Sequence, residues 1–397
     1  MTVRVAIAYN FNDGDWLGGR NYFGSLFTAF AKLAPSDIEL VLVIGEKTQT
    51  SLPEAFPWLQ VLRTPLMDRM HPSWLVRQLT LRALGSDPLL ERFLVRHRVD
   101  ILTHSSHLGA RSRVRTLPWL YDFQFMHLPE YWEPKDIAWA EKRYNGACRY
   151  GTGIIVSSQD ALNDLERFAP WCKLPSHVLR FVSNPVSFDR LPAREDLLLR
   201  HVIPDNFFYL PNQFWSNKNH RLAIDALALL KSQGVDATIV CTGKTFDGRK
   251  PQFFEELMAY CREQGVEDRF KVLGVVPYVD LQGLMAYSCG VINPSRFEGW
   301  STTVEEAKTF HQRLLLSDLP VHREQSPRFG RFFSPDDPVA LAGHMRDCLA
   351  EGPRPIDPLT IAVDYEARLK AFGECFVDIL RSVPTGAGSR ARGAVAS

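Results

Sequence analysis

The segment NPSRFEGWSTTVEEAK, residues 293–308, carries two carboxylates in a spacing that suits ligand binding. Glu298 precedes a helix that we expect to begin near Ser301 or Thr302, and Glu306 lies inside its first turns. Backbone N–H groups at a helix start bind anions without any side-chain charge. Carboxylates on both sides of such a site accept hydrogen bonds from hydroxyls. The arrangement therefore suits a nucleotide sugar, which has a diphosphate between two polyhydroxyl rings.

The amides of the turn and of the first helical positions form the expected anion site. These residues are Gly299, Trp300, Ser301, Thr302 and Thr303. The alternative interpretation of the segment is a capping box, pairing Thr302 with Glu305 or Thr303 with Glu306. A capping box accounts for Glu305 but not for Glu298, which precedes the helix.

A second segment, LPNQFWSNKNHRLAIDAL at residues 210–227, places Lys218 at an expected helix start. A cation there opposes the helix dipole and is mildly unfavourable by itself. It becomes favourable if the helix and Lys218 both face a bound diphosphate; an exposed lysine is the alternative. Gly243 ends the next expected strand, Ala237–Thr242, and is a further candidate for binding the same ligand.

The N-terminal segment DGDWLGGRNYFG, residues 13–24, follows an expected strand at Val3–Ala8. Its glycines do not form a GxGxxG pattern, so a dinucleotide fingerprint is poorly supported. Gly18 and Gly19, at the turn into a helix, would let a phosphate or sugar approach the backbone, or would simply allow a tight turn. Asp13-Gly14-Asp15 imitates a DxD metal motif but comes too early, so we predict no metal site.

The segment YDFQFMHLPEYW, residues 121–132, offers His127 as a polar group among aromatic side chains. A hydrogen-bonded loop histidine is the alternative role for His127. His104 and His107, in THSSHLG, are competing candidates, and we assign no site role to the other histidines. Val276, in GVVPYVDL, is a candidate for contact with a nucleotide base, although this segment is equally an ordinary loop between strand and helix.

These motifs resemble those of the retaining glycosyltransferases of family 4, which have the GT-B fold of two Rossmann-like domains. The resemblance runs from the glycine pair at 18–19 to SDLPVHRE at 317–324 and centres on Glu298-x7-Glu306. It implies that Glu298 binds the donor sugar and Glu306 the ribose. It also implies that Lys218 holds the diphosphate.

The resemblance assigns two further roles. His127 is expected to contact the donor sugar and the reacting centre, unless the family's histidine corresponds to the position of Phe125. Asn212 stands where the family has an arginine, and its amide donates hydrogen bonds without charge.

The implied activity is that of a retaining, metal-independent glycosyltransferase of the hexosyltransferase type. The nucleotide sugar is a co-substrate, no cofactor is expected, and the acceptor would be a glycan or a lipid-linked sugar in bacterial surface polysaccharide assembly. Alternatives are a nucleotide-sugar epimerase of the same fold, an NAD(P)-dependent oxidoreductase and a non-catalytic sensor of sugar nucleotides.

Buried strands alternate with helices along the chain, which predicts an α/β protein with parallel sheets covered on both faces. At 397 residues the chain is long enough for two domains. We expect an acceptor-binding domain at 1–195, a donor-binding domain at 196–363 and a central cleft. A helix at about 364–382 would pack back on the first domain, and residues 383–397 would form a disordered tail.

The charge composition bears on partners. The formal net charge is +1, with 46 Lys and Arg against 45 Asp and Glu, which argues against nucleic-acid binding. No apolar run is long enough to cross a membrane, no secretory signal is evident, and the seven cysteines form no CxxC pair. We therefore expect the cytoplasm.

One stretch departs from this balance. Residues 60–115 hold ten Arg, no Lys and four acidic residues, with Trp74 and Phe93 interleaved. This stretch is a candidate for contact with an anionic membrane or a diphosphate-lipid acceptor; a solvated helical face is the alternative.

Overall fold

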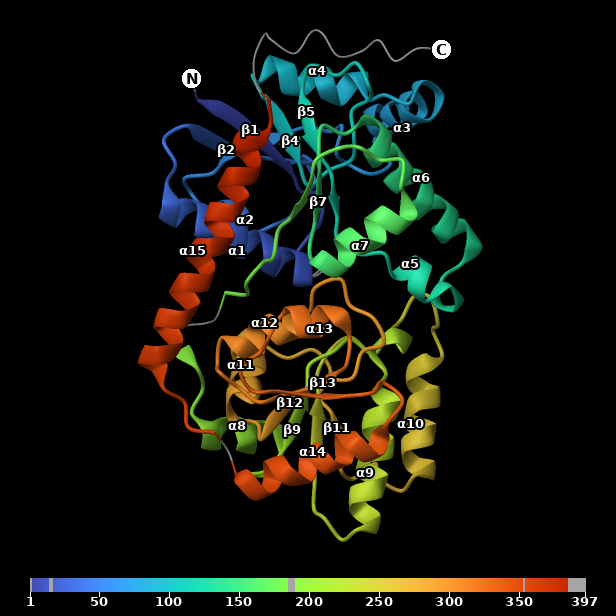
Figure 1. The fold of residues 1–397 in the computed structure, drawn as a ribbon, viewed down its shortest axis with the longest axis vertical. Helices are drawn as coiled ribbons and strands as arrows, with labels where there is room; N and C mark the ends of the chain where they lie inside the picture. Colours follow the sequence, from blue (N-terminus) through green and yellow to red (C-terminus); the bar gives the residue numbers. More distant parts are fainter. Residues whose placement is uncertain (1, 14–16, 185–189, 353, 385–397) are drawn as a thin grey trace. The chain divides into compact units, whose positions relative to one another are not determined.

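The computed structural model describes residues 2–13, 17–184, 190–352 and 354–384 (Figure 1). These residues divide into two compact units. Unit 1 takes the described residues up to 123, residues 138–181 and those from 369 on; unit 2 takes 124–137 and the described residues of 182–368. Residues 385–397 of the predicted tail lie outside the described residues.

Unit 1 is built on two parallel sheets, one of five strands in the order β3-β2-β1-β4-β5 and one of three in the order β6-β7-β8. The strands are β1 Val3–Ala8, β2 Ile38–Ile44, β3 Gln60–Arg63, β4 Ile101–Thr103, β5 Arg115–Leu117, β6 Trp119–Leu120, β7 Ile154–Val156 and β8 Ser176–Val178. The helices are α1 Leu17–Leu33, α2 Leu52–Ala55, α3 Pro72–Leu84, α4 Pro88–Arg96, α6 Pro134–Tyr150 and α7 Gln159–Phe168, with the end of α15, Pro358–Ser382.

Unit 2 contains one parallel sheet of six strands in the order β11-β10-β9-β12-β13-β14. The strands are β9 Phe208–Leu210, β10 Ile239–Cys241, β11 Phe270–Val272, β12 Gly290–Asn293, β13 Leu314–Ser317 and β14 Gly330–Phe333. The helices are α5 Gln124–His127, α8 Arg194–His201, α9 His220–Ser232, α10 Phe253–Glu263, α11 Tyr278–Tyr287, α12 Thr302–Lys308, α13 Pro320–Glu324 and α14 Pro338–Glu351.

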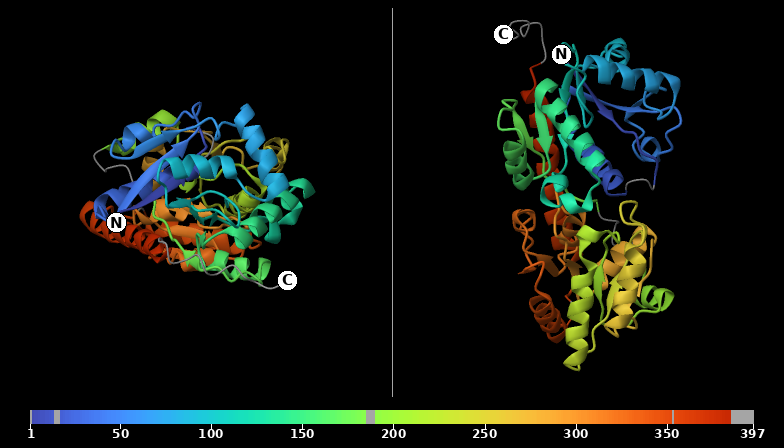
Figure 2. Two further views of the ribbon diagram at one scale, coloured as in Figure 1. Left: turned by 90° about the horizontal axis from the view of Figure 1, so that it is seen from above. Right: turned by 90° about the vertical axis from the view of Figure 1, so that its right-hand side faces the viewer.

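The strands of unit 2 are apolar on both faces because helices cover both sides of the sheet (Figure 1). Phe208 and Ile239 face the core that includes α9, α10 and α14. Tyr209 and Val240 face the opposite core with α8, α11 and α12. The predicted class, α/β with parallel sheets, is confirmed. Figure 2 shows the same elements from two further directions.

Two differences from the sequence analysis concern local structure. The apolar run Leu117–Tyr121 predicts one strand, but the structure has two, β5 and β6, separated by Pro118, which has no N–H to donate to a ladder. Gly18 and Gly19 do not form a turn before the helix, since α1 already begins at Leu17 and includes both.

The division into units also differs from the predicted boundary at residue 195. Residues 124–137 group with unit 2 because they contact its side chains: Arg249 donates to Gln124 (3.1 Å), and its guanidinium lies over the ring of Trp132. The described residues between Val182 and residue 195 also group with unit 2. Residues from Leu369 on group with unit 1, where the ring of Phe372 packs on Tyr22.

No helix of the described residues is long and apolar enough to cross a bilayer.

Candidate functional site

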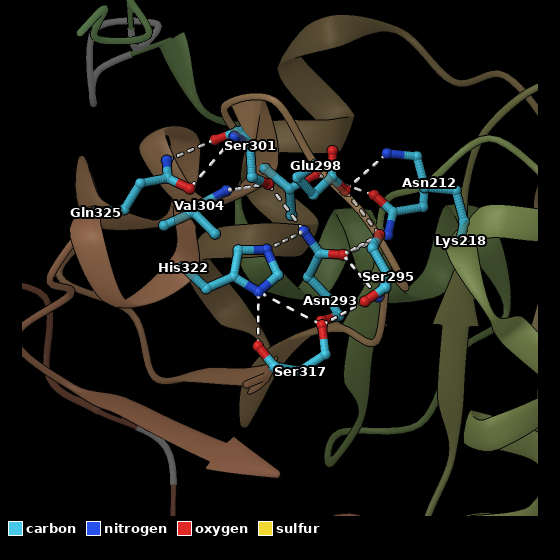
Figure 3. Close-up of polar contacts among 11 residues, drawn as sticks. Asn212, Lys218, Asn293, Ser295, Glu298, Ser301, Val304, Ser317, His322 and Gln325 are labelled. Atoms are coloured by element: carbon cyan, nitrogen blue, oxygen red, sulfur yellow. Dashed lines mark hydrogen bonds and ion pairs between the residues drawn. The ribbon is translucent and has the colours of Figure 1, made fainter. Parts of the chain in front are cut away.

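The centre of the site is an ion pair between two loops of unit 2 (Figure 3). Strands β9 and β12 are neighbours in the sheet, and the loops that follow them carry Lys218 and Glu298. Lys218 Nζ lies 2.7 Å from Glu298 Oε1, and the side chains are only 15% and 11% exposed. Carboxyl ends of parallel strands are where open α/β sheets bind ligands. The structure thus brings together two residues that the sequence proposed independently.

Glu298 is held as a carboxylate. Burial alone would raise its pKa, but the charges of Lys218 and His322, with hydrogen bonds from Lys218 and Ser295, outweigh burial and lower the pKa. Ser295 Oγ lies 2.7 Å from the same Oε1 that accepts from Lys218. No described residue is hydrogen-bonded to Oε2, so this oxygen can accept from a ligand hydroxyl.

A buried amide network lies behind the ion pair. Asn293 Oδ1 accepts from Asn212 Nδ2 (3.0 Å), and Asn293 Nδ2 donates to Ser301 Oγ (2.8 Å). Thr303 Oγ1 donates to Asn212 Oδ1 (3.1 Å). The side chain of Asn212, a predicted donor ligand, therefore joins the strand ends of β9 and β12 and the start of α12. This use of Asn212 follows from its burial and is invisible in the sequence.

The start of α12 differs from the expected anion site. Ser301 is the N-cap, with its Oγ accepting from the amide of Val304 (3.3 Å), so neither predicted capping box forms. The Ser301 amide donates to Gln325 Oε1 (3.2 Å), and Gln325 Nε2 donates back to the Ser301 carbonyl (2.9 Å). The Ser301 amide, which the sequence analysis expects to face the ligand, thus has Gln325 as its partner in this structure. Gly299 and Trp300 form the bend before Ser301, and Thr302 is the first residue of α12.

Glu305 is likewise not a cap. It is almost fully buried and accepts from Lys308 Nζ (3.0 Å), Gln325 Nε2 (3.0 Å) and Arg368 Nη1 (3.2 Å). Since Arg368 comes from α15 and Gln325 follows α13, Glu305 joins two other segments of unit 2 to α12. Its role in the structure is to fix the helix that carries Glu306.

Glu306 is buried on α12 and is engaged by a tyrosine. Tyr278 OH lies 3.1 Å from Glu306 Oε1 and 3.2 Å from the Asn184 carbonyl oxygen, so its one proton is shared between these two acceptors. Burial, together with the nearby charge of Glu306, raises the pKa of Tyr278 well above its ordinary value, so the phenol stays protonated and remains a donor. Val276, the other candidate in this stretch, is half-buried two residues before Tyr278 and packs on the core below.

His127 lies beside the turn that carries Glu298. Its ring and that of Phe297 are 4.9 Å apart between centroids, and His127 is exposed. Phe125, two residues earlier, is buried and packs on Trp132. Of these two positions, His127 is the one beside the Glu298 turn.

The competing histidines belong to unit 1. His104 bonds Tyr22 OH (2.6 Å), and burial lowers its pKa to about 3. His107 packs on the ring of Tyr150. Neither residue joins Lys218 and Glu298 within unit 2.

His322 is a residue of the site to which the sequence analysis assigned no role. It is fully buried, its Nδ1 donates to the Ser317 carbonyl (2.8 Å), and its Nε2 lies 3.5 Å from Asn293 Nδ2. Burial lowers the pKa of His322 despite the opposing charge of Glu298. The available signal was its place in SDLPVHRE, directly after the apolar run that forms β13.

Gly243 has a packing role that the structure makes explicit. Its φ is +139°, and a Cβ there would lie 2.6 Å from the carbonyl oxygen of Asn212. Only glycine lets the chain after β10 pass so close to the loop that leads to Lys218.

Gly18 and Gly19 belong to unit 1, in the first turn of α1. The Asp13 carboxylate accepts from the Ser51 amide (2.9 Å) and Thr50 Oγ1 (3.1 Å), while Gly14 and Asp15 lie outside the described residues. The described residues contain no cluster of three or more His, Cys, Asp or Glu side chains suited to a metal ion.

Comparison with known proteins gives a matching family and a matching fold. The family model "Glycosyl transferases group 1" matches residues 206–351, which include Lys218, Glu298 and Glu306. No curated protein matches the sequence.

Several solved structures are similar over nearly the whole chain. Anabaena HepE in complex with UDP has a TM-score of 0.66 at 17% identity, covering 96% of this chain and 100% of that one. WaaG, a glycosyltransferase involved in lipopolysaccharide biosynthesis, has a TM-score of 0.62 at 14% identity, covering 95% and 100%. Sucrose-phosphate synthase from Thermosynechococcus elongatus has a TM-score of 0.63 at 14% identity, covering 96% and 94%. The chain thus has the two Rossmann-like bodies of GT-B glycosyltransferase structures, and its residues 206–351 match the glycosyl transferases of group 1.

Proposed function

We propose that this protein is a retaining glycosyltransferase that moves a sugar from a nucleotide diphosphate sugar to a glycan or lipid-linked acceptor. The observation that carries the proposal is the Lys218–Glu298 pair, which presents an ammonium group and a carboxylate oxygen at the carboxyl ends of adjacent strands. A sugar diphosphate offers that pair an anion and hydroxyl groups side by side.

The two members of the ion pair have different proposed roles. Lys218 Nζ, held by Glu298 Oε1, turns its remaining N–H donors to the diphosphate and stabilises the negative charge that develops on the leaving group. Glu298 Oε2 accepts from a hydroxyl of the donor sugar. His127, beside Phe297, contacts the sugar from the other side of the Glu298 turn.

Glu306 is proposed to bind the ribose. Tyr278 lies beside Oε1 and orients the carboxylate, which accepts hydrogen bonds from the ribose hydroxyls in this proposal. The 206–351 match and the UDP and UDP-glucose complexes of HepE, a protein of similar fold, support a nucleoside diphosphate as the ligand class.

In the proposed reaction, the bond between the anomeric carbon and the diphosphate oxygen breaks as the acceptor hydroxyl bonds to the same face of the anomeric carbon. The acceptor proton passes to the leaving phosphate oxygen, so the configuration is retained and no protein nucleophile is needed. Lys218 supplies the charge stabilisation, so we propose that no metal is required. The fold similarity to WaaG, a glycosyltransferase involved in lipopolysaccharide biosynthesis, favours an acceptor of the surface-polysaccharide class.

The test is release of nucleoside diphosphate from a panel of UDP-, GDP-, dTDP- and ADP-sugars in the presence of acceptor glycans. The wild-type protein should turn over one donor, also in the presence of EDTA, and proton NMR of the product should show the donor's anomeric configuration. Lys218→Ala and Glu298→Gln should each reduce turnover by roughly tenfold or more, since each removes a charged contact. Glu263→Gln, at an exposed position on α10, is the matched control and should leave turnover unchanged.

Three results would overturn the proposal. Release of N-acetylmannosamine without an acceptor would identify an epimerase. NADH binding in a fluorescence titration, without sugar-nucleotide binding, would favour an oxidoreductase. Wild-type turnover in Lys218→Ala or Glu298→Gln would remove that residue from the site.

A further inference from the structure

Helix α3 of unit 1 presents an apolar face to solvent. It spans 13 residues, and none of its side chains is buried. Its exposed positions include Leu75, Val76, Leu79 and Ala83, whose spacing places them along one side of a helix. Leu79 is 63% exposed. A surface helix of a globular protein ordinarily directs such a stripe to the core, whereas this stripe lies on the exposed side of α3.

The opposite side of α3 holds the helix on its unit. Arg77 on that side pairs with the buried carboxylate of Asp87 and donates to the Leu66 carbonyl (3.0 Å). His71 accepts from the amide of Ser73 and caps the first turn. Figure 1 shows α3 beside α4 at the edge of unit 1. These contacts fix α3 in the orientation that leaves the apolar stripe exposed to solvent.

The charges around the stripe have one sign. Residues 69–86 contain no acidic residue and no lysine, and Arg69 and Arg82 are exposed. Asp68, just before this segment, is buried and accepts from the amides of Glu46 and Lys47. Asp87, just after it, is neutralised by Arg77. The exposed face thus combines aliphatic side chains with arginines.

Two arginines of the predicted Arg-rich stretch make contacts within the fold. Arg63 donates to the carbonyls of Gly45 (3.3 Å) and Thr48 (3.4 Å), and Arg77 is committed to Asp87. These two arginines serve the fold. Arg69 and Arg82 remain at the ends of the apolar stripe.

We propose that α3 docks unit 1 on an anionic lipid bilayer, lying parallel to the surface with the aliphatic stripe between the head groups. The stripe supplies apolar burial at the interface, and Arg69 and Arg82 pair with lipid phosphates. A second copy of the chain fits less well, because a symmetric pairing of α3 would bring these arginines together without an acidic partner from residues 69–86.

The test is co-sedimentation of the full chain with vesicles of equimolar phosphatidylglycerol and phosphatidylcholine, compared with vesicles of phosphatidylcholine alone. The wild-type protein should bind the anionic vesicles and bind the neutral ones at least roughly tenfold more weakly. Leu75→Glu with Leu79→Glu should abolish binding, and Arg69→Gln with Arg82→Gln should weaken it roughly tenfold or more.

Two matched controls test whether binding depends on the exposed side of α3 rather than on the kind of substitution. Leu359→Glu with Val363→Glu introduces two glutamates with the same spacing on an exposed part of α15 in unit 2. Lys142→Gln with Lys173→Gln removes two exposed charges elsewhere in unit 1. Both pairs should bind vesicles as the wild type does. Circular dichroism and thermal unfolding should be unchanged in all four variants, since every altered side chain is exposed.

Equal binding of wild type and the Leu75/Leu79 variant would overturn the proposal. So would a wild-type dimer in sedimentation velocity that this variant converts to monomer without any vesicle binding, since α3 would then join two copies. The vesicle assay needs no sugar donor, so its outcome is independent of the proposed transferase activity.

Discussion

Lys218 and Glu298, eighty positions apart in the sequence, form a largely buried ion pair at the carboxyl ends of strands β9 and β12. The pair is placed by the sheet order, because β12 adds beside β9 on the side opposite β10. The pKa of Glu298 then depends on Lys218, and each side chain holds the other in position.

Replacing Lys218 with alanine should destabilise the fold. Glu298 would keep a buried carboxylate without its cation, at a cost of about 1–3 kcal/mol. The double variant Lys218→Ala with Glu298→Gln should recover most of this loss, because the unpaired charge is removed, while turnover stays low. Urea unfolding at neutral pH measures both variants, and a double variant no more stable than Lys218→Ala would contradict the coupling.

Stability should respond to pH through Glu298. Its pKa in the folded protein is lowered from the ordinary value of 4.5. The stabilisation from its ionised form is therefore complete above the unfolded pKa and is lost as the pH falls through the lower folded pKa. The difference in Tm between wild type and Glu298→Gln should thus narrow on going from neutral to acid pH. Glu263→Gln should show no such trend, and a difference that widens in acid would refute the assignment.

Removing the Tyr278 hydroxyl should weaken donor binding, given the proposed role of Glu306. Tyr278→Phe deletes the hydrogen bond that orients Glu306, so KM for the donor should rise by roughly threefold to tenfold with little change in kcat. Tyr287→Phe is the control on the same helix, because its hydroxyl donates only to the Pro192 carbonyl (3.0 Å). Steady-state kinetics decide the point, and identical effects of the two variants would argue against an orienting hydroxyl.

A methyl group at Gly243 should cost more than one at another positive-φ glycine. Gly243→Ala adds a clash with the Asn212 backbone to an unfavourable φ, and we expect a loss of at least about 3 kcal/mol. Gly234 has φ +72° with open space around its Cβ position, so Gly234→Ala should cost about 1 kcal/mol. Thermal unfolding of the two variants measures both losses of stability. Equal losses would contradict the prediction.

Strands buried on both faces were easy to predict, whereas the edges of the sheets were not. The mostly aliphatic run Ile38–Ile44 predicts a strand with the bounds that β2 has, because such a run has few alternatives. The edge strands β3 and β14 were missed, since each is four residues long and incompletely buried and so lacks a clear period. Glu305 was misread for a related reason: its spacing from Thr302 fits a capping box, but Arg368, Lys308 and Gln325 compete for its carboxylate.

The sequence by itself determined the α/β class and the polar residues that follow the strands, because both depend on local patterns of burial and turn chemistry. Only the tertiary structure decided that Lys218 meets Glu298 and that the amides of Asn212 and Ser301 are used inside the protein. It also decided that His322 lies behind the site and that the apolar stripe of α3 faces outward. These outcomes depend on which distant segments share a sheet edge or a helix face, and hydrogen-bond partners of that kind are chosen by packing rather than by spacing along the chain.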